Sequence, residues 1–397
     1  MKKVLLLTAI LTALVCNAVQ AATPDELYDY VWKLISKKYV DPTNNYQDWN
    51  QWRYKYKNKL KTFDDCYVAI DTMLASLDDP YTRFLDEKEF NEETTSIRGS
   101  LKGIGTQIGI RDGNLVIIAP IENSPAELAG LKADDQILEI DGKSTKGISI
   151  DKAADRIRGE KGTTVNLLIK RANAEPKNYI IVRDEIEIKS VSTKMPIETK
   201  IPEDIQYIRL SSFISKNASN EIQNILRNCS DKSGIILDLR SNPGGLLSNA
   251  ITISDMFLSG GVIVSTVDRD RYKDTTRATI TNLTNKPLVV LINKGSASAS
   301  EILSGALKDN RRAVIVGEQS YGKGLVQEIN KLPNSTGMNL TIQRYLTPSG
   351  ADINKKGITP DIVVELTEEH VKNKDDVQLK RAVKVLQEMQ CLSQKNG

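Results

Sequence analysis

Apolar and polar positions alternate with two different periods along this chain, and the change of period divides it into regions. Between residues 24 and 95 the spacing is helical, with apolar side chains recurring through 27–35 and again through 64–77. We expect a helix in each segment, and the second helix should end at Asp78-Asp79, directly before Pro80. The stretch between them is aromatic, and it fits either a core or a partner surface: Trp49, Trp52, Tyr54 and Tyr56.

Short strands and glycine turns replace the helical pattern between about 99 and 171. Ser124 and Glu127 form a capping box around Pro125, which predicts a short helix, and residues 150–157 predict a second, amphipathic one. Asp141-Gly142 predicts a tight hairpin turn. The strands expected in this α+β region are 114–119, 136–140 and 163–169.

After residue 200 the pattern becomes strand, loop, helix, repeated, which predicts an α/β core. Two of the strands are continuous apolar runs, as expected of strands covered on both faces. The predicted strands are 205–210, 234–239, 287–292 and 313–316. The predicted helices are 219–229, one that follows the loop 240–245 and ends near 258, 298–307 and 377–389.

Residues 1–21 have the pattern of a signal peptide. Lys2 and Lys3 precede an apolar run over 4–15, and Val19-Gln20-Ala21 provides the residues that a signal peptidase reads. The run is shorter than the roughly 20 residues of a membrane-spanning helix. Lipid anchoring at Cys16 is disfavoured because Val15 is bulkier than the small residue usual before a lipidated cysteine. We therefore expect an exported, soluble or peripherally membrane-associated protein, periplasmic in a bacterium.

Composition excludes several classes of function. The 397 residues contain 54 basic and 51 acidic side chains, and removal of the signal peptide takes two lysines, so no nucleic-acid partner is expected. A single histidine, His370, leaves no conventional Ser-His-Asp triad and, with scattered cysteines, no zinc ligand set. Cys66, Cys229 and Cys391 remain in the mature chain, and this odd number predicts at least one free or intermolecular thiol.

A turn rich in small residues, 293–302, is the first candidate for chemistry. Ser298 and Glu301 form a capping box, so Ser298 could serve only as a helix cap. The start of a helix would also present a serine nucleophile beside unpaired backbone N–H groups that stabilise developing negative charge. Spacing alone leaves Ser296 and Ser300 as competing nucleophiles.

The second candidate is 317–324, which nearly spells a phosphate-binding loop ending in Gly322-Lys323. Gly324 stands where that loop needs Ser or Thr, the next segment looks like a strand, and export separates the protein from ATP, so no nucleotide is expected. Without a usable histidine, a serine hydrolase needs another base. Lys323 could serve if burial lowered its pKa by about three units, at a cost of roughly 4 kcal/mol.

The region around residues 100–170 resembles a PDZ domain. Three motifs carry the resemblance: Gly103-Ile104-Gly105-Thr106, residues 124–131 and residues 136–142. In such a domain the glycine-flanked loop directs backbone N–H groups at a peptide's terminal carboxylate, and the next strand pairs with the peptide. Thr106 differs from the hydrophobic residue often found at its position.

Over nearly its whole mature length the chain is similar to the carboxyl-terminal processing peptidases, a family of serine endopeptidases. The resemblance implies an α/β fold with a crotonase-like protease core, an inserted α+β PDZ domain, and helical N- and C-terminal segments. It rests, besides the PDZ motifs, on residues 79–85, 238–245, 295–302, 321–324 and 357–361. The resulting domains are signal peptide 1–21, N-terminal helical region 22–95, PDZ domain 96–172, protease core 173–370, and C-terminal helix and tail 371–397.

The resemblance also implies roles for single residues. Ser298 becomes the nucleophile and Lys323 its base, with Gln327 orienting the lysine. Gly245 and Ala299 donate the backbone N–H groups of the oxyanion hole. The remaining implied residues are Gly103, Ile104 and Gly105, which bind the substrate carboxylate, and Arg158, which couples the PDZ domain to the protease.

We therefore expect an endopeptidase that needs no cofactor or metal and cleaves proteins or peptides near free, apolar C-termini. An adaptor protein is a further potential partner, and the amphipathic terminal helices favour a homo-oligomer. One alternative is a catalytically inactive PDZ adaptor that only binds C-termini, although the presence of both Ser298 and Lys323 argues against it. The other is a P-loop nucleotide binder.

Overall fold

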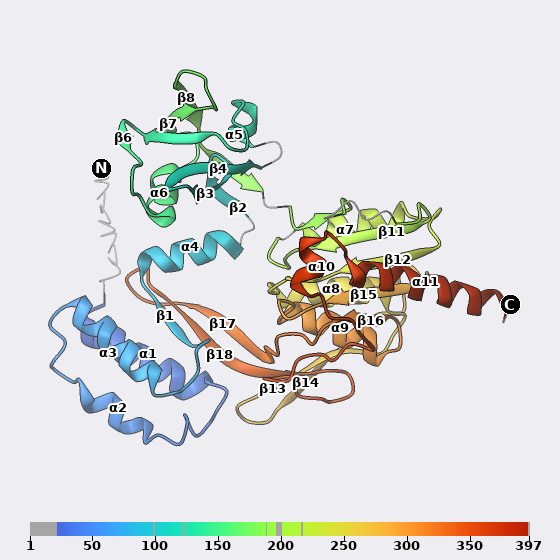
Figure 1. Ribbon diagram of the computed structural model, residues 1–397. Helices are drawn as coiled ribbons and strands as arrows, with labels where there is room; N and C mark the ends of the chain where they lie inside the picture. The colour runs from blue at the N-terminus through green and yellow to red at the C-terminus, as the bar shows by residue number, and fades with distance from the viewer. Residues whose placement is uncertain are drawn as a thin grey trace, which may run out of the picture. The chain divides into compact units, whose positions relative to one another are not determined.

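A computed structural model describes residues 22–97, 100–121, 124–187, 189–195, 201–215 and 217–395, so the predicted signal peptide lies outside the described residues (Figure 1). The described residues form two compact units. One contains those up to Phe90 together with Glu328–Leu340. The other contains Asn91–Gln327 and those from Thr341 onward.

The first unit is mainly helical, as predicted, with α1 (Pro24–Lys38), α2 (Trp49–Lys55) and α3 (Phe63–Ala75). Thr62 and Thr23 begin α3 and α1 with capping boxes. The aromatic stretch is divided between core and surface, because Trp49 is buried whereas Tyr54 is 60% exposed.

A three-residue strand that the helical pattern did not predict, β1 (Arg83–Leu85), pairs antiparallel with Gly337–Asn339 of β18 (Gly337–Leu346). The helix α4 (Glu87–Ile97) follows it. So short a strand shows no periodicity of its own, and only its long-range pairing defines it.

The region predicted as a PDZ domain is built around one antiparallel sheet in the order β3-β4-β5-β7-β8, with β6 paired to β5. The predicted strands and helices are all present. The sheet also includes β8, beyond the predicted domain end at residue 172, because β8 pairs with β7 over six residue pairs. Its strands are β3 (Thr106–Arg111), β4 (Asn114–Pro120), β5 (Gln136–Ile140), β6 (Lys143–Ser144), β7 (Thr164–Lys170) and β8 (Lys177–Val182). The helices are α5 (Pro125–Leu128) and α6 (Ile150–Ile157), and β2 (Ser100–Gly103) pairs with β9 (Asp184–Glu187).

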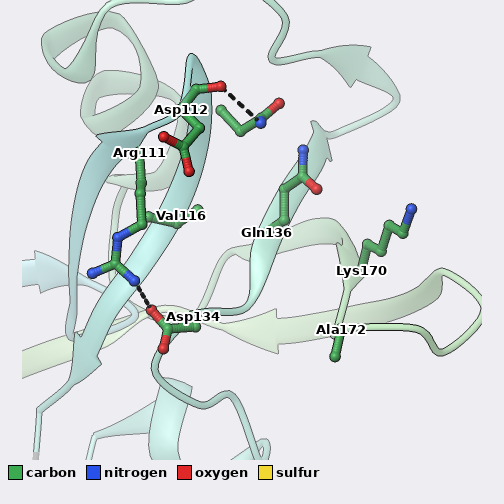
Figure 2. Close-up of a pocket in the computed structure, with 8 residues that line it drawn as sticks. Arg111, Asp112, Val116, Asp134, Gln136, Lys170 and Ala172 are labelled. Atoms are coloured by element: carbon green, nitrogen blue, oxygen red, sulfur yellow. Dashed lines mark hydrogen bonds and ion pairs between the residues drawn. The ribbon is translucent and has the colours of Figure 1, made fainter.

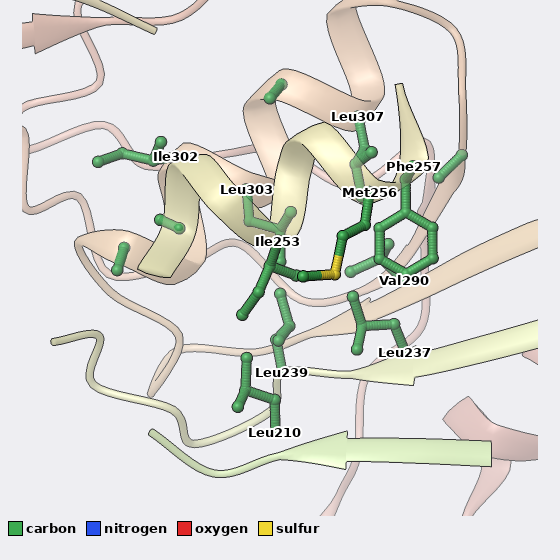
Figure 3. Close-up of a cluster of buried hydrophobic side chains, with 14 of the residues drawn as sticks. Leu210, Leu237, Leu239, Ile253, Met256, Phe257, Val290, Ile302, Leu303 and Leu307 are labelled. Carbon is green, nitrogen blue, oxygen red and sulfur yellow. The ribbon is translucent and has the colours of Figure 1, made fainter. Parts of the chain in front are cut away.

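The predicted α/β core is a sheet in the order β10-β11-β12-β15-β16-β19, parallel from β11 onward. Alternate residues of its strands face two hydrophobic clusters, one under α7, α8 and α9 and the other under α11. Figure 3 shows the first cluster, where Phe257 and Leu303 lie over Leu237 and Val290. The strands are β10 (Val191–Ser192), β11 (Ile205–Leu210), β12 (Gly234–Asp238), β15 (Leu288–Ile292), β16 (Val314–Gly317) and β19 (Ile362–Val363). The helices are α7 (Ala218–Arg227), α8 (Leu247–Phe257), α9 (Ala299–Asp309) and α11 (Val377–Lys395).

Four further elements depart from the simple alternation of strand and helix. A hairpin of β13 (Val262–Asp268) and β14 (Lys273–Arg277) leaves the α/β pattern, and β13 also pairs with the second half of β18. The strand β17 (Leu325–Lys331) pairs with β18, and a short helix, α10 (Glu368–Lys372), precedes α11.

A buried ion-pair network ties the end of β12 to the start of α11. The Arg240 guanidinium, 7% exposed, donates to both oxygens of Asp376 at 2.8 Å and also binds Asp238. Burial opposes ionisation of Asp238, but the hydrogen bonds and charge of Arg240 outweigh it and hold the pKa of that carboxyl below its usual 3.8. Its ionised form therefore stabilises the fold above about pH 4, and this contribution is lost as the pH falls further.

We predict that Asp376→Asn lowers the free energy of unfolding by about 3 kcal/mol, because it weakens a buried pair and leaves Asp238 as the one carboxylate, among the described residues, bound to Arg240. Asp375→Asn is the matched control, since the neighbouring Asp375 pairs at 2.7 Å with Lys380, whose side chain is 61% exposed. That surface pair should contribute less than about 1 kcal/mol. Urea unfolding followed by circular dichroism measures both, and equal losses would show that burial of the Arg240 pair is irrelevant.

Candidate active site

The loops that carry the sequence candidates meet at one edge of the parallel sheet. They follow β12, β15 and β16, whose carboxyl ends lie side by side. Backbone hydrogen bonds join the loops: Ala297 N–H donates to the Asn242 carbonyl at 3.0 Å, and Tyr321 N–H donates to the Ser296 carbonyl at 3.0 Å. The structure thus brings together the segments 239–246, 293–300 and 318–324.

Ser298 differs from its two competitors in both conformation and exposure. The hydroxyls of Ser296 and Ser300 are fully buried and donate to the carbonyls of Leu239 and Asn242 at 2.8 and 2.9 Å. Ser298 is half-buried and has φ 54° and ψ −114°, a strained conformation for a residue with a side chain. Ser296 and Ser300 therefore stabilise the loop, whereas the turn holds Ser298 at the start of α9.

Lys323 lies in the loop that joins β16 to β17 and is half-buried. The flanking glycines are required by packing. A Cβ on Gly322 would lie 2.9 Å from Lys356 N, and a Cβ on Gly324 would lie 2.7 Å from Asn354 N. The backbone on both sides of Lys323 is thus pressed against another loop. This differs from a solvated turn, the common setting of a lysine between glycines.

The segment after Lys323 is the strand β17, as predicted, and not the helix that a phosphate-binding loop requires. Gln327 lies within β17, and its Nε2 donates to Thr341 Oγ1 at 3.3 Å. Lys323 itself precedes the strand. The two residues therefore do not lie on one face of a single regular strand.

The backbone N–H groups of Ser298 and Lys323 donate to the same atom. Both contact Oε2 of Glu301, at 2.8 and 2.9 Å. The Glu301 contact to Ser298 confirms one half of the predicted capping box. The contact to Lys323 was not predictable from spacing, because it joins loops that follow different strands.

The glycine pair at 244–245 lies directly against the Ser298 turn. A Cβ on Gly244 would lie 2.8 Å from Ser298 Cβ and 3.0 Å from the backbone nitrogen of Ala299. Gly245 has φ +143°, and a Cβ there would lie 2.5 Å from the backbone carbon of Phe213. Gly244 is therefore needed for close approach to the Ser298 turn, and Gly245 for close approach to the backbone at Phe213.

The predicted carboxylate-binding loop lies between β2 and β3 in the PDZ region. Ile104 is buried, and its carbonyl accepts from Ala126 N–H at 2.8 Å, while the Gly105 carbonyl accepts from Ser124 Oγ at 2.8 Å. Arg158 ends α6 beside this loop, since a Cβ on Gly103 would lie 3.8 Å from Arg158 Cα. The sheet order places β3 at an end of the described sheet.

A small pocket at the other end of β3 is separate from this loop. It encloses about 210 Å³ and is lined by both charge signs, including Arg111, Asp134 and Lys170 (Figure 2). Arg111 and Asp134 form an ion pair across it. The pocket lies away from the glycine-flanked loop and contains two carboxylates, Asp112 and Asp134, so it gives no reason to place the substrate's carboxylate there.

His370 has a local structural contact. Its Nδ1 accepts from Thr367 N–H at 3.3 Å, at the start of α10. Among the residues that the structure describes, no three His, Cys, Asp or Glu side chains group as metal ligands would. Within the same residues no helix has the length and apolar character to cross a membrane. Cys66 and Cys229 are buried and Cys391 is exposed, each as a free thiol.

Comparisons with known proteins agree with this arrangement. Residues 204–364 match the model of peptidase family S41, and residues 116–171 match a PDZ domain. A carboxyl-terminal-processing protease of Picosynechococcus sp. is 42% identical over 95% of this chain and 93% of its own length. The chloroplastic carboxyl-terminal-processing peptidase 2 of Arabidopsis thaliana is 35% identical over 89% of this chain and 74% of its own.

A solved structure, the photosystem II D1 C-terminal processing protease, aligns with a TM-score of 0.60. Its sequence is 32% identical, and the alignment covers 87% of this chain and 94% of that one. The predicted S41 fold with a PDZ domain is thereby confirmed. This chain belongs to peptidase family S41, as a serine protease of the carboxyl-terminal-processing group with a PDZ domain.

Proposed function

We propose that this protease is an exported endopeptidase in which Ser298 is the nucleophile and Lys323 is its general base. The neutral Lys323 amine takes the proton of Ser298 Oγ as that oxygen attacks the scissile carbonyl, and it donates this proton to the leaving nitrogen as the C–N bond breaks and the acyl-enzyme forms. Lys323, neutral again, then accepts a proton from the water that attacks the ester, and it returns this proton to Ser298 Oγ as the acid product is released.

The shared contact of Ser298 and Lys323 with Glu301 Oε2 is the observation that carries this proposal. Two backbone nitrogens within 3 Å of one oxygen place these two residues close together, although 25 residues separate them in the sequence. Ser296 and Ser300 are excluded from the same role because their buried hydroxyls are already bound to carbonyls.

The oxyanion hole consists, in this proposal, of the backbone N–H groups of Gly245 and Ala299. Ala299 is the first residue of α9, where N–H groups lack partners within the helix and the helix dipole favours negative charge. The close packing of Gly244 on Ser298 and Ala299 supports the pairing of these two loops. Gln327 orients the lysine from β17.

Substrates are proteins recognised by their C-terminus through the PDZ domain. In our proposal the loop Gly103-Ile104-Gly105 binds the terminal carboxylate, and the peptide adds to the free edge of β3. We expect apolar final residues to be favoured because Ile104 of this loop belongs to the hydrophobic core of the PDZ region. Arg158, which ends α6 beside Gly103, is placed to relay occupancy of the loop to the protease, with or without an adaptor protein.

Export and self-association complete the proposal. The basic residues and apolar run of residues 1–21 support cleavage near Ala22 and a periplasmic or equivalent location, which N-terminal sequencing of the mature protein tests. Amphipathic terminal helices support a homo-oligomer, because α1 carries an exposed Tyr30 outside its buried face.

Substitutions in the dyad should separate a proton acceptor from a mere positive charge. We predict that Ser298→Ala and Lys323→Ala each lower kcat on a peptide substrate by at least about 10⁴-fold. Lys323→Arg should be equally inactive, because a guanidinium with a pKa above about 12 does not accept the serine proton near neutral pH. His370→Ala is the control and should retain wild-type turnover. Substantial activity in Lys323→Arg would refute the assignment of Lys323 as base.

Gly245→Ala should lower kcat by about 10²- to 10³-fold, the usual loss for one oxyanion donor, because the new Cβ forces the backbone away from Phe213. Gly260→Ala is a matched control. Gly260 has a similar φ of +135°, but a Cβ there meets no atom within 4 Å. Steady-state kinetics and thermal unfolding are measured for both variants, and a loss of kcat in Gly245→Ala alone shows displacement of the loop rather than backbone strain. A fully active, folded Gly245→Ala enzyme would exclude Gly245 from the oxyanion hole.

Amidation of a substrate's C-terminus should lower kcat/KM by at least about tenfold, because the amide removes the charge that the loop's N–H groups bind. Gly105→Ala should abolish this discrimination, since its Cβ would lie 2.4 Å from Ser124 Cβ. Gly113→Ala, with φ near +75° and open space around it, should preserve it. Equal cleavage of the acid and the amide by the wild-type enzyme would mean that the carboxylate is not read.

A further inference from the structure

Glu301 is far more deeply engaged than a helix cap requires. It is 1% exposed, and both of its carboxylate oxygens are occupied. Oε2 accepts from the N–H groups of Ser298 and Lys323, while Oε1 accepts from Ser320 Oγ at 2.5 Å and from Gly322 N–H at 2.7 Å. A cap uses only the first of these contacts, so three of the four donors come from the loop that carries Lys323.

A second buried side chain binds the same two residues through their carbonyls. The hydroxyl of Tyr345, which is 1% exposed in β18, lies 3.2 Å from the Ser298 carbonyl oxygen and also contacts the Lys323 carbonyl oxygen. The backbone of Tyr345 is itself fixed, because its N–H donates to the Gly324 carbonyl at 3.0 Å. Glu301 thus holds the N–H groups of the two residues, and Tyr345 holds their carbonyls.

From these contacts we propose that Glu301 and Tyr345 are positioning residues, which set the separation of Ser298 and Lys323 without touching the substrate. This inference rests on the proposed Ser298–Lys323 dyad. Proton transfer requires the serine oxygen and the lysine nitrogen to lie about 3 Å apart, and a misplacement of about 1 Å can cost 10²-fold in rate. Because the two loops follow different strands, their covalent connection does not fix the distance between the serine oxygen and the lysine nitrogen.

The tyrosine offers the cleaner substitution, because Tyr345→Phe keeps the ring and removes only the hydroxyl. We expect kcat to fall by about 10- to 100-fold while KM changes less than twofold. Labelling of the serine by a fluorophosphonate probe should slow by a similar factor, and this small probe has no C-terminal carboxylate for the PDZ loop to bind. The thermal midpoint should shift no more than that of the control variant.

Tyr207→Phe is the matched control. Tyr207 is also buried, at 3% exposure, and its hydroxyl donates to a carboxylate, Asp238 Oδ2, at 2.8 Å. The Tyr207→Phe substitution removes a comparable buried hydrogen bond that involves neither Ser298 nor Lys323, so kcat and the labelling rate should stay at wild-type values.

Glu301→Gln is the second test. Its amide preserves size but replaces an acceptor oxygen by a donor, and we expect a loss at least as large as for Tyr345→Phe.

The possible results separate this inference from the proposed function. Wild-type kcat and labelling in Tyr345→Phe, or a raised KM with unchanged kcat, would overturn the positioning role even if Ser298→Ala is inactive. Equal losses in Tyr345→Phe and Tyr207→Phe would also overturn it. An active Ser298→Ala enzyme would instead refute the dyad. If Glu301→Gln does not fold, the Tyr345→Phe kinetics decide.

Discussion

The buried carboxylate of Glu301 is the contact on which the candidate active site depends. A charge that is 1% exposed is costly to bury, by several kcal/mol, unless its lone pairs are satisfied. Four donors from Ser298, Ser320, Gly322 and Lys323 satisfy it. Any movement of one loop away from the other would leave part of this carboxylate unpaired, so the same requirement that stabilises the charge also holds the two loops in register.

The parallel sheet makes this convergence available. Because β12, β15 and β16 are neighbours and run in one direction, the loops after them leave the sheet at a common edge. Close backbone contacts then join these loops. Gly244, Gly322 and Gly324 each lie where a Cβ would collide with a neighbouring loop or with Ser298, so the glycines of the sequence motifs are explained by packing rather than by flexibility.

A second buried charge network lies at the same edge of the sheet, at the beginning of the 239–246 loop. Arg240 follows β12 and binds Asp238 and Asp376, which connects the beginning of the 239–246 loop to the helix α11. The C-terminal helix, which covers one face of the sheet through Leu379 and Leu386, is thereby joined to the protease core by charge as well as by apolar contact. The PDZ region has its own core, and it contains the loop Gly103-Ile104-Gly105 that we propose as the binding site for the substrate's C-terminus.

The order and type of most elements were determined by local sequence. Continuous apolar runs marked β12 and β15, capping residues marked α5, and the segment after Lys323 was expected to be a strand, because these signals reside in residues close together along the chain. The short β1 was not predicted, since it is defined by pairing with β18 far along the chain. The β13–β14 hairpin and the inclusion of β8 in the PDZ sheet were not predicted either, although each joins strands adjacent in the sequence, because most residues of β14 and β8 are exposed and give little apolar pattern.

For the candidate site, too, some features were predictable from the sequence and others only from the tertiary structure. Sequence alone identified the segments around Ser298 and Lys323, and a family resemblance assigned their roles, but spacing could not choose among Ser296, Ser298 and Ser300. The tertiary structure distinguishes the three serines, because it buries the hydroxyls of Ser296 and Ser300 against carbonyls, and the proposal of Ser298 as nucleophile uses this difference. It also gave Glu301 its connection to Lys323 and placed Tyr345 beside both residues, because hydrogen bonds between loops depend on how the strands are ordered, and no local pattern encodes that order.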